Sequence, residues 1–193
     1  LGTALEVTAD PALHGSLAEN LLRQGKLEEA TAELSALPPE LMATEPMQML
    51  EGKLRLRGGD LGAARQSFAA AYGETPSSRA AIALSTVLWR LDDRTAAIER
   101  LTDWLADNPE DGMALNQLAS YYSETGADSK AVETWERLLR LDPDNSIILN
   151  NLAWHYRTTD TRRALQYVDR ALENAPDSGN ILDTRALILL NAG

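Results

Sequence analysis

The sequence contains no cysteine, which excludes disulfide bonds and thiolate metal sites from the chain. Histidine is scarce too: His14 and His155 are the only two. Aromatic residues make up 5% of the 193 residues, and no apolar run is long enough to predict a membrane-spanning helix. Basic residues number 18 against 29 acidic ones, so the net charge of −11 provides no basic field for broad nucleic-acid binding.

The sequence does contain a pattern that repeats every 33 or 34 residues. Four prolines follow one another at steps of 33, 34 and 33 residues, and an alanine stands twelve positions before each. The prolines are Pro76, Pro109, Pro143 and Pro176, and the alanines are Ala64, Ala97, Ala131 and Ala164. A fixed period of this length indicates a repeat protein. Stacked repeats offer a long concave surface in place of one deep pocket, which favours binding over catalysis.

The repeat from Gly112 to Asn145 shows what each period contains. Its first half carries apolar and small residues three or four positions apart, on one helix face: Leu115, Leu118, Ala119 and Tyr122. After Gly126, a second stripe follows at the same spacing and ends at a turn: Ala131, Trp135, Leu138, then Asp142 and Pro143. The pattern predicts two amphipathic helices joined by a tight turn, a helical hairpin.

The same skeleton predicts five hairpins and a final helix. After a tail at 1–10, the predicted repeats are 11–44, 45–77, 78–111, 112–145 and 146–178, followed by a helix at 179–193. The first repeat shows Leu17, Ala18, Leu21, Ala30 and Leu34. The second departs most, because Glu51 and Arg55 occupy positions expected to be apolar, and its stripe is predicted at Met47, Leu50 and Leu54. The helix at 179–193 repeats the first half of a hairpin without its partner, so we expect a longer array.

These features resemble the tetratricopeptide repeat, a 34-residue unit with a small residue in each helix and a closing proline. The resemblance covers Pro11 to Gly193. It implies an all-α fold, a right-handed α-solenoid superhelix of helical hairpins, and a non-catalytic role in binding proteins. Small residues are expected where the two helices of a hairpin cross, because bulk there would force the helices apart. The expected crossing residues include Ala119, Ala131, Ala153 and Ala164.

The resemblance also implies where a partner would bind. In the family the first helices line the concave groove, chiefly through repeat positions two, five, nine and twelve. In the second and third repeats the groove residues are Lys53, Arg57, Arg79, Trp89 and Arg90. In the later repeats they are Asn116, Gln117, Ser120, Asn150, Asn151, Trp154 and Arg157, with Asn180 and Asp183 in the final helix. A cationic cluster in an acidic chain would steer an acidic protein or peptide segment into the groove.

The remaining tryptophans and polar motifs have structural interpretations. Trp104 and Trp135 fall on core positions of second helices.

Family members that clamp a free C-terminal carboxylate pair a lysine with asparagines. Asn151 matches one asparagine, but Asn150 and Ser120 do not complete the set, so no such clamp is expected.

No catalytic, cofactor or metal site is predicted. A Ser-His-Asp arrangement with either histidine lacks a nucleophile motif, and both histidines are expected to be partly exposed helix residues. The run from Asp142 to Asn145 lacks the glycine and glutamate of a calcium loop and is interpreted as a helix cap and turn. Gly58, Gly59 and Asp60 are interpreted as a turn, because no phosphate-loop lysine follows.

A narrower resemblance concerns the C-terminal repeats. The run from Leu149 to Trp154, then Ala175-Pro176-Asp177 and Leu182-Asp183-Thr184, is similar to bacterial repeat lipoproteins of the exosortase protein-sorting system. Most such sequences continue Gly-Trp, where this chain has Arg185-Ala186. The resemblance implies a bacterial assembly or secretion system and favours a periplasmic or outer-membrane-anchored location, with a cytoplasmic location as the alternative.

Two other functions stay open at this point. The chain could be an architectural module that self-associates through an apolar face of the final helix at Leu182, Ala186 and Leu189. It could also be an accessory domain of a larger enzyme.

Overall fold

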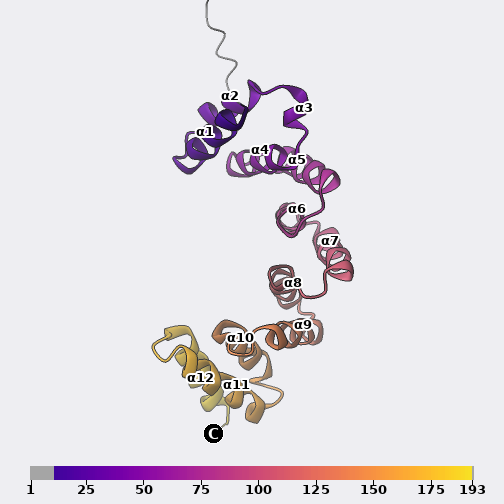
Figure 1. Cartoon of the computed structure of the whole chain (residues 1–193). Helices are drawn as coiled ribbons and strands as arrows, with labels where there is room; N and C mark the ends of the chain where they lie inside the picture. Colours follow the sequence, from indigo (N-terminus) through magenta and orange to yellow (C-terminus); the bar gives the residue numbers. More distant parts are fainter. Residues whose placement is uncertain (1–10, 193) are drawn as a thin grey trace, which may run out of the picture. The chain divides into compact units, whose positions relative to one another are not determined.

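The computed structural model describes residues 11–192, which form twelve helices and no strands (Figure 1). The first six are α1 (Pro11–Arg23), α2 (Leu27–Ser35), α3 (Pro39–Met42), α4 (Glu45–Arg57), α5 (Leu61–Glu74) and α6 (Ser78–Arg90). The remaining six are α7 (Arg94–Asp107), α8 (Gly112–Glu124), α9 (Asp128–Leu141), α10 (Ser146–Tyr156), α11 (Thr161–Asn174) and α12 (Gly179–Ala192). The predicted all-α fold class is confirmed.

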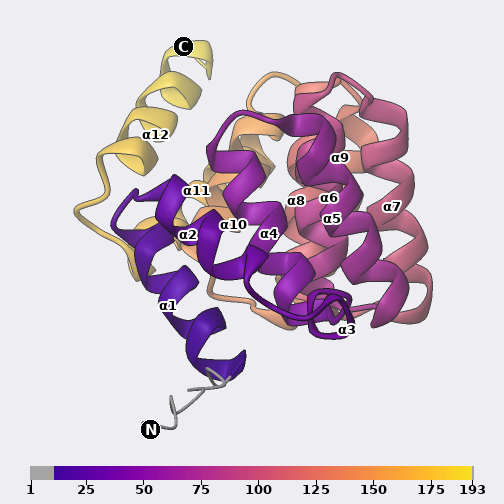
Figure 2. The same cartoon turned by 90° about the horizontal axis from the view of Figure 1, so that it is seen from above.

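The helices pack as antiparallel hairpins (Figure 2). The chain divides into two compact units. The first unit ends at Arg100 and the second begins at Leu101, so the boundary falls within α7. In the first unit α1 packs on α2, α4 on α5, and α5 on α6. In the second unit α8 packs on α9, α9 on α10, α10 on α11, and α11 on α12. Within each unit, neighbouring hairpins thus pack on one another, as a repeat with two apolar stripes requires.

Small residues at the helix crossings are fully covered. Ala119, Ala131, Ala153 and Ala164 have no exposed surface, as predicted. Trp135 and Leu138 of α9 are buried in the core of the second unit. In α8 the buried ring is that of Tyr121, whereas Tyr122 is only half-buried and holds the Lys130 ammonium 5.4 Å from its ring centre.

Two apolar stripes of the first unit differ from the prediction. In α1, Leu17 is 40% exposed and Leu22 is buried in its place. In α4, Met49 is buried and Met47 is only partly covered. The reason in α4 lies in Gly52, which has no side chain and lies against the ring of Phe68, so the helix packs on α5 through the face that holds Gly52 and Met49.

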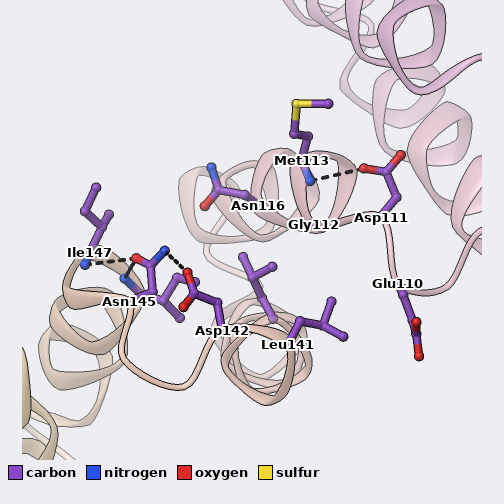
Figure 3. A pocket seen from close by; sticks show the side chains of 11 residues that line it. Glu110, Asp111, Gly112, Met113, Asn116, Leu141, Asp142, Asn145 and Ile147 are labelled. Atoms are coloured by element: carbon purple, nitrogen blue, oxygen red, sulfur yellow. Dashed lines mark hydrogen bonds between the residues drawn. The ribbon is translucent and has the colours of Figure 1, made fainter.

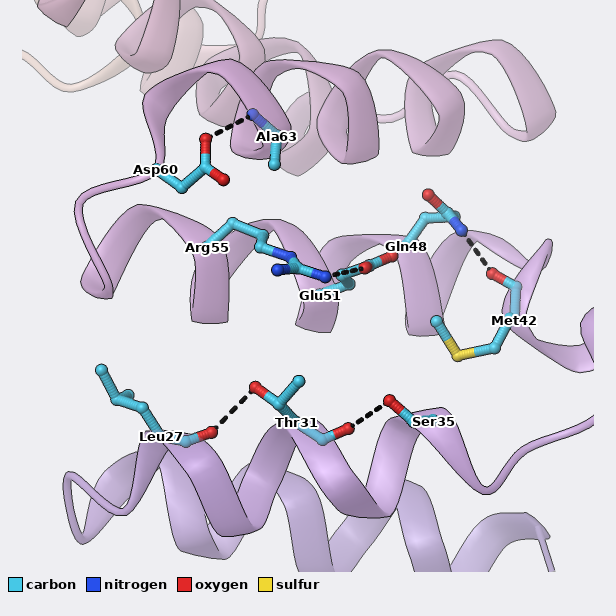
Figure 4. A network of polar contacts seen from close by, with 9 residues as sticks. All are labelled: Leu27, Thr31, Ser35, Met42, Gln48, Glu51, Arg55, Asp60 and Ala63. Atoms are coloured by element: carbon cyan, nitrogen blue, oxygen red, sulfur yellow. Dashed lines mark hydrogen bonds and ion pairs between the residues drawn. The ribbon is translucent and has the colours of Figure 1, made fainter.

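Glu51 and Arg55 of α4 lie on the side of the helix that faces α2 (Figure 4). Arg55 donates to Glu51 across one helical turn at 3.2 Å. On the facing helix the Thr31 and Ser35 hydroxyls donate to carbonyls of α2 itself. These side chains line a hollow between the two helices, so the polar pair occupies a gap in the packing and is not forced into a dry core.

The turns explain the glycine and aspartate punctuation of the sequence. Gly59 and Gly126 adopt φ values of +85° and +73°, which favour glycine. Asp60 accepts a hydrogen bond from the Ala63 amide and caps α5. The run from Asp142 to Asn145 is a cap and turn, as predicted, because Asn145 accepts hydrogen bonds from two amides at the start of α10.

An arginine of the second helix holds the loop at the start of two repeats. Arg137 of α9 donates to the Pro109 carbonyl at 3.1 Å. Arg170 of α11 donates to the Pro143 carbonyl at 2.9 Å. The two contacts are equivalent in consecutive repeats, so Pro109 and Pro143 are each held by the second helix of the repeat that follows.

The final helix packs through one face and exposes the other. Ile181, Thr184 and Ile188 are buried against the preceding hairpin. Leu182 and Leu189 are 46% and 44% exposed, and Ala186 is also exposed. The apolar stripe predicted to lack a partner helix is therefore open among the residues that the structure describes.

Candidate binding surfaces

Three of the predicted cationic residues meet in one hollow of the first unit. Lys53 and Arg57 of α4 and Arg90 of α6 surround the apolar side chains of Leu22 and Leu56. The hollow has a volume of about 360 Å³ and no acidic residue lines it. We call this set of five residues the basic hollow.

The three cations of the basic hollow have different local partners. The Arg57 guanidinium donates to the Leu22 carbonyl at 3.1 Å and so satisfies an acceptor at the C-terminal end of α1. Lys53 and Arg90 are exposed, and neither forms an ion pair with any residue from 11 to 192. Their charges are therefore the ones available to an anionic ligand.

Arg79 lies in a neighbouring hollow that has mixed charge. It lines a space of about 250 Å³ together with Lys53, Glu19 and Glu45. The Ser77 hydroxyl lies 3.4 Å from the Glu45 carboxylate at the edge of this space. Because two carboxylates offset two cations there, Arg79 is a weaker candidate for anion binding than Arg90.

A different hollow opens in the second unit (Figure 3). It has a volume of about 540 Å³ and lies among the starts of α8 and α10 and the end of α9. Its apolar lining is Met113, Leu138, Leu141, Ile147 and Ile148. Its polar lining is Glu110, Asp111, Asn116, Asp142 and Asn145, and Gly112 completes it. We call this set the apolar hollow.

Two polar residues of the apolar hollow are committed to helix caps. Asp111 accepts hydrogen bonds from the Met113 and Ala114 amides and from the Trp104 indole. Asn145 caps α10 and also donates to Asp142 at 2.8 Å (Figure 3). These caps accept hydrogen bonds from free amides at the starts of α8 and α10 and so fix two walls of the hollow.

The predicted amide row is only partly available to a ligand. Asn116 is exposed and lines the apolar hollow, and Asn180 is exposed on α12. Gln117 and Asn151 are half-buried, and the Ser120 hydroxyl donates to the Asn116 carbonyl. The Asn150 side-chain oxygen is covered and has no hydrogen-bond partner among the described residues, so it offers a ligand less than Asn116 does.

The two tryptophans predicted for the groove both stack with arginine. Trp154 is 40% exposed, and the Arg157 guanidinium lies 3.7 Å from its ring centre while donating to the Trp154 carbonyl. Trp89 is half-buried, with Arg94 at 4.7 Å. Each pair presents a cation that is already engaged with an aromatic face.

Met113, Leu141 and Ile147 line the apolar hollow, but they are not among the groove residues predicted from the sequence. Met113 and Ile147 occupy position two of consecutive repeats, as Arg79 does one repeat earlier. The sequence therefore contained a signal for Met113 and Ile147: both are large apolar residues at repeat position two, which faces the groove in the family. Leu141 gave no such signal, because it ends a second helix.

The structure also brings a serine, a histidine and an aspartate together in the second unit. His155 of α10 lies 3.1 Å from the Ser123 hydroxyl and 3.2 Å from the Asp128 carboxylate. Its side chain is 10% exposed, and its ring packs on Trp135. Burial lowers the pKa of His155, and Arg157 adds to this while Asp128 opposes it.

This trio lies where three helices meet. Ser123 lies in the last turn of α8, where the helix presents carbonyls. Asp128 is largely hydrated, since its side chain is 69% exposed. The arrangement is a polar contact that joins α8, α9 and α10. Within residues 11–192 no group of three or more histidine or acidic side chains could hold a metal ion.

Among the described helices, none combines the length and the apolar character that crossing a membrane requires.

The comparisons with known proteins agree with the repeat geometry. A family model described as tetratricopeptide repeat matches residues 82–146 and 129–179. Cellulose synthase operon protein C of Pseudomonas fluorescens (strain SBW25) is 30% identical over 103 residues, which are 53% of this chain. The chain spans only 8% of the length of that curated relative.

Solved structures share the fold at low sequence identity. YrrB, a protein of the same repeat type with an unusual peptide-binding site, has a TM-score of 0.68 at 20% identity, with 92% of each chain covered. MamA from Desulfovibrio magneticus RS-1 has a TM-score of 0.71 at 20% identity, covering 88% of this chain and 97% of its own. PilF of Pseudomonas aeruginosa has a TM-score of 0.71 at 17% identity, with 93% and 89% covered.

Proposed function

Because this chain belongs to the tetratricopeptide repeat family, we propose that it is a protein–protein interaction scaffold whose basic hollow binds an acidic segment of a partner. The observation that carries the proposal is the convergence of Lys53, Arg57 and Arg90 on one hollow with no acidic lining, in a chain with a net charge of −11. A local cationic site attracts an anionic segment, while the acidic remainder of the surface repels that segment and so directs it to the cationic site.

The mixed apolar and cationic lining of the basic hollow suits a peptide rather than a small ion. Leu22 and Leu56 lie among the cations, so an acidic residue can pair with Lys53 or Arg90 while a neighbouring apolar side chain contacts the leucines. YrrB is described as having a peptide-binding site on the same fold, which supports a peptide ligand here.

The test is fluorescence anisotropy with a labelled oligoglutamate peptide that carries one leucine. We expect the Lys53→Glu/Arg90→Glu variant to lose affinity by about tenfold or more, since both exposed charges reverse. The matched control is Arg65→Glu/Arg162→Glu, which makes the same change in net charge at exposed positions of α5 and α11. Arg79→Glu alone should cost less than the double variant, because Glu19 and Glu45 already offset its charge.

Equal loss in the test and control variants would mean that the peptide responds only to net charge. Unchanged affinity in the Lys53→Glu/Arg90→Glu variant would exclude the basic hollow as the binding site. Circular dichroism of each variant checks that helicity is unaltered.

A second candidate function is self-association through α12. Leu182, Leu187 and Leu189 are each more than 40% exposed, and Leu190 is 77% exposed. An apolar surface of this kind favours contact with a second copy. Sedimentation velocity over a dilution series tests it, and the Leu182→Ser/Leu190→Ser variant should then remain monomeric at concentrations where the wild type associates.

A bacterial assembly or secretion system is the proposed context. Its support is the relation to the cellulose synthase operon protein C and the resemblance of the run from Leu149 to Trp154 to exosortase-associated lipoproteins. Co-purification from bacterial lysate with the wild type and the Lys53→Glu/Arg90→Glu variant would identify partners that depend on the basic hollow. Partners captured equally by both forms would count against that hollow as their site.

A further inference from the structure

We propose that the apolar hollow of the second unit is a second peptide site, which binds a segment with a large apolar side chain flanked by lysine or arginine. The inference deepens the proposed scaffold function and rests on it only for the general role of binding peptides. Its ligand is opposite in charge to the ligand of the basic hollow, and its residues belong to a different unit.

The first support is the convergence of exposed apolar side chains. Met113 is 62% exposed, Ile147 is 67% exposed and Leu141 is 43% exposed, and all three line the same hollow. A single exposed apolar residue is ordinary on a protein surface, but several at one concave place mark a binding site. Covering them removes apolar area from water, which favours an apolar ligand group.

The second support is the floor beneath these side chains. Leu138 and Ile148 are buried and form a packed apolar base. Gly112 lies close above this base, because a Cβ atom there would come within 3.3 Å of a Leu138 methyl. The volume of about 540 Å³ falls within the range of roughly 300–1,000 Å³ that ligand pockets usually have.

The third support is the sign of the charge around the hollow. Glu110, Asp111 and Asp142 line it, and no basic side chain does. The end of α9 adds the negative end of a helix, and Asp111 already caps the positive end of α8. Arg137 of α9 donates instead to the Pro109 carbonyl, so its guanidinium is engaged in the loop before α8.

Two polar groups are available to hold a ligand in place. Glu110 is exposed and has no hydrogen-bond or ion-pair partner among residues 11–192, so its carboxylate can pair with a lysine or arginine. The Asn116 side-chain amide is exposed at the same hollow and can both donate to and accept from a peptide backbone. The apolar anchor and the cationic flank are therefore specified by different residues.

The experiment uses the whole chain and three labelled peptides of equal length. The first carries leucine and phenylalanine between lysines, the second has glutamates in place of the lysines, and the third has alanines in place of the apolar residues. We expect only the first to bind this site. The Met113→Ser/Ile147→Ser variant should lose about tenfold in affinity or more, and Glu110→Lys should lose about threefold.

Two controls make the result specific. Leu182→Ser/Leu190→Ser removes two exposed leucines from α12 and should leave affinity for the lysine peptide unchanged. Lys53→Gln/Arg90→Gln removes two charges of the basic hollow without adding carboxylates, so it should also leave this affinity unchanged, whereas it should weaken binding of the oligoglutamate peptide if the proposed function holds. Failure of either site is thus distinguishable from failure of the other.

Several outcomes would overturn the inference. Equal binding of the glutamate and lysine peptides would exclude charge recognition, and an unaltered Met113→Ser/Ile147→Ser variant would exclude the apolar hollow. If sedimentation shows that the wild type self-associates and the Met113→Ser/Ile147→Ser variant does not, the occupant of the apolar hollow is a second copy of the chain and not a basic peptide.

Discussion

The α4–α5 and α8–α9 hairpins place an aromatic ring at the same position of the repeat, but the two rings pack in different directions. Phe68 of α5 lies against Gly52 of its own hairpin. Trp135 of α9 packs on His155 of the next hairpin, with ring centres 4.9 Å apart. Where Gly52 stands in α4, α8 has Ala119, which is fully covered.

The comparison shows how the repeat tolerates variation. Residues at the crossing are constrained together, since a larger group on one helix needs a smaller one opposite. The residues that line the hollows are not constrained in this way, so α4 carries Lys53 and Arg57 at the basic hollow while α8 carries Met113 and Asn116 at the apolar hollow. One backbone thus supports a basic hollow in one unit and an apolar, acidic one in the other.

The largest effect is expected from filling the space that Phe68 uses. Gly52→Ala puts a Cβ atom into the ring of Phe68 and should destabilise the first unit by roughly 3 kcal/mol in urea unfolding, through overpacking. The matched control is Gly73→Ala on α5, where a Cβ atom meets nothing within 4 Å and stability should change little. Adding Phe68→Leu to Gly52→Ala should recover part of the loss, and a purely additive double variant would contradict the volume exchange.

The next effect tests the alanine of the other hairpin. Ala131→Leu should cost about 1–3 kcal/mol, because Ala131 is fully covered at the crossing of α8 and α9. Thermal unfolding measures it against Ala69→Leu, an exposed site on α5. An unchanged melting temperature in Ala131→Leu would mean that the crossing can open without loss.

Helix caps provide a smaller comparison between the same two hairpins. Asp111→Ala removes the acceptor of two α8 amides and of the Trp104 indole, and it should cost about 2 kcal/mol. Asp60→Ala removes the acceptor of one α5 amide and should cost about 1 kcal/mol. Urea titrations of both variants give the order, and a larger loss for Asp60→Ala would reverse it.

The smallest effect concerns the ring on which Trp135 packs. Burial lowers the pKa of His155 in the folded chain, so the unfolded chain binds a proton at this ring more readily. The neutral His155 ring therefore contributes fully to the free energy of unfolding above about pH 6.5, the ordinary pKa of histidine. This contribution is lost as the pH falls through the lowered folded value. Unfolding free energies of the wild type and His155→Gln, compared between pH 7.5 and 5, should show a steeper decline for the wild type. Parallel pH profiles would exclude a role for His155 titration.

The sequence predicted the hairpins well because the period, the small crossing residues and the turn glycines are local signals. Ala131, Gly126 and Asn145 each have one physical task that residue type alone reveals. The stripes of α1 and α4 were less predictable, because burial of Leu22 and Met49 depends on which face the neighbouring helix covers. No periodicity in α4 alone signals that Gly52 lies against Phe68.

The grouping of residues around the two hollows was predictable only in part. The cationic residues follow from repeat position and charge, and Lys53, Arg57 and Arg90 do line one hollow. Their separation from Arg79 depends on Glu19 and Glu45, which come from other helices. The apolar hollow needs Leu141 from the end of α9 beside Met113 and Ile147, a juxtaposition that sequence spacing does not encode.

The contacts of Arg137 with Pro109 and of Arg170 with Pro143 bear on how such a chain can be lengthened. Each contact joins a repeat's second helix to the loop through which the chain enters that same repeat. A repeat copied from Pro109 to Asp142 would therefore bring its own anchor for its entry loop wherever it was inserted. Duplication at this boundary conserves the connection, whereas a cut within the hairpin would separate the arginine from its carbonyl.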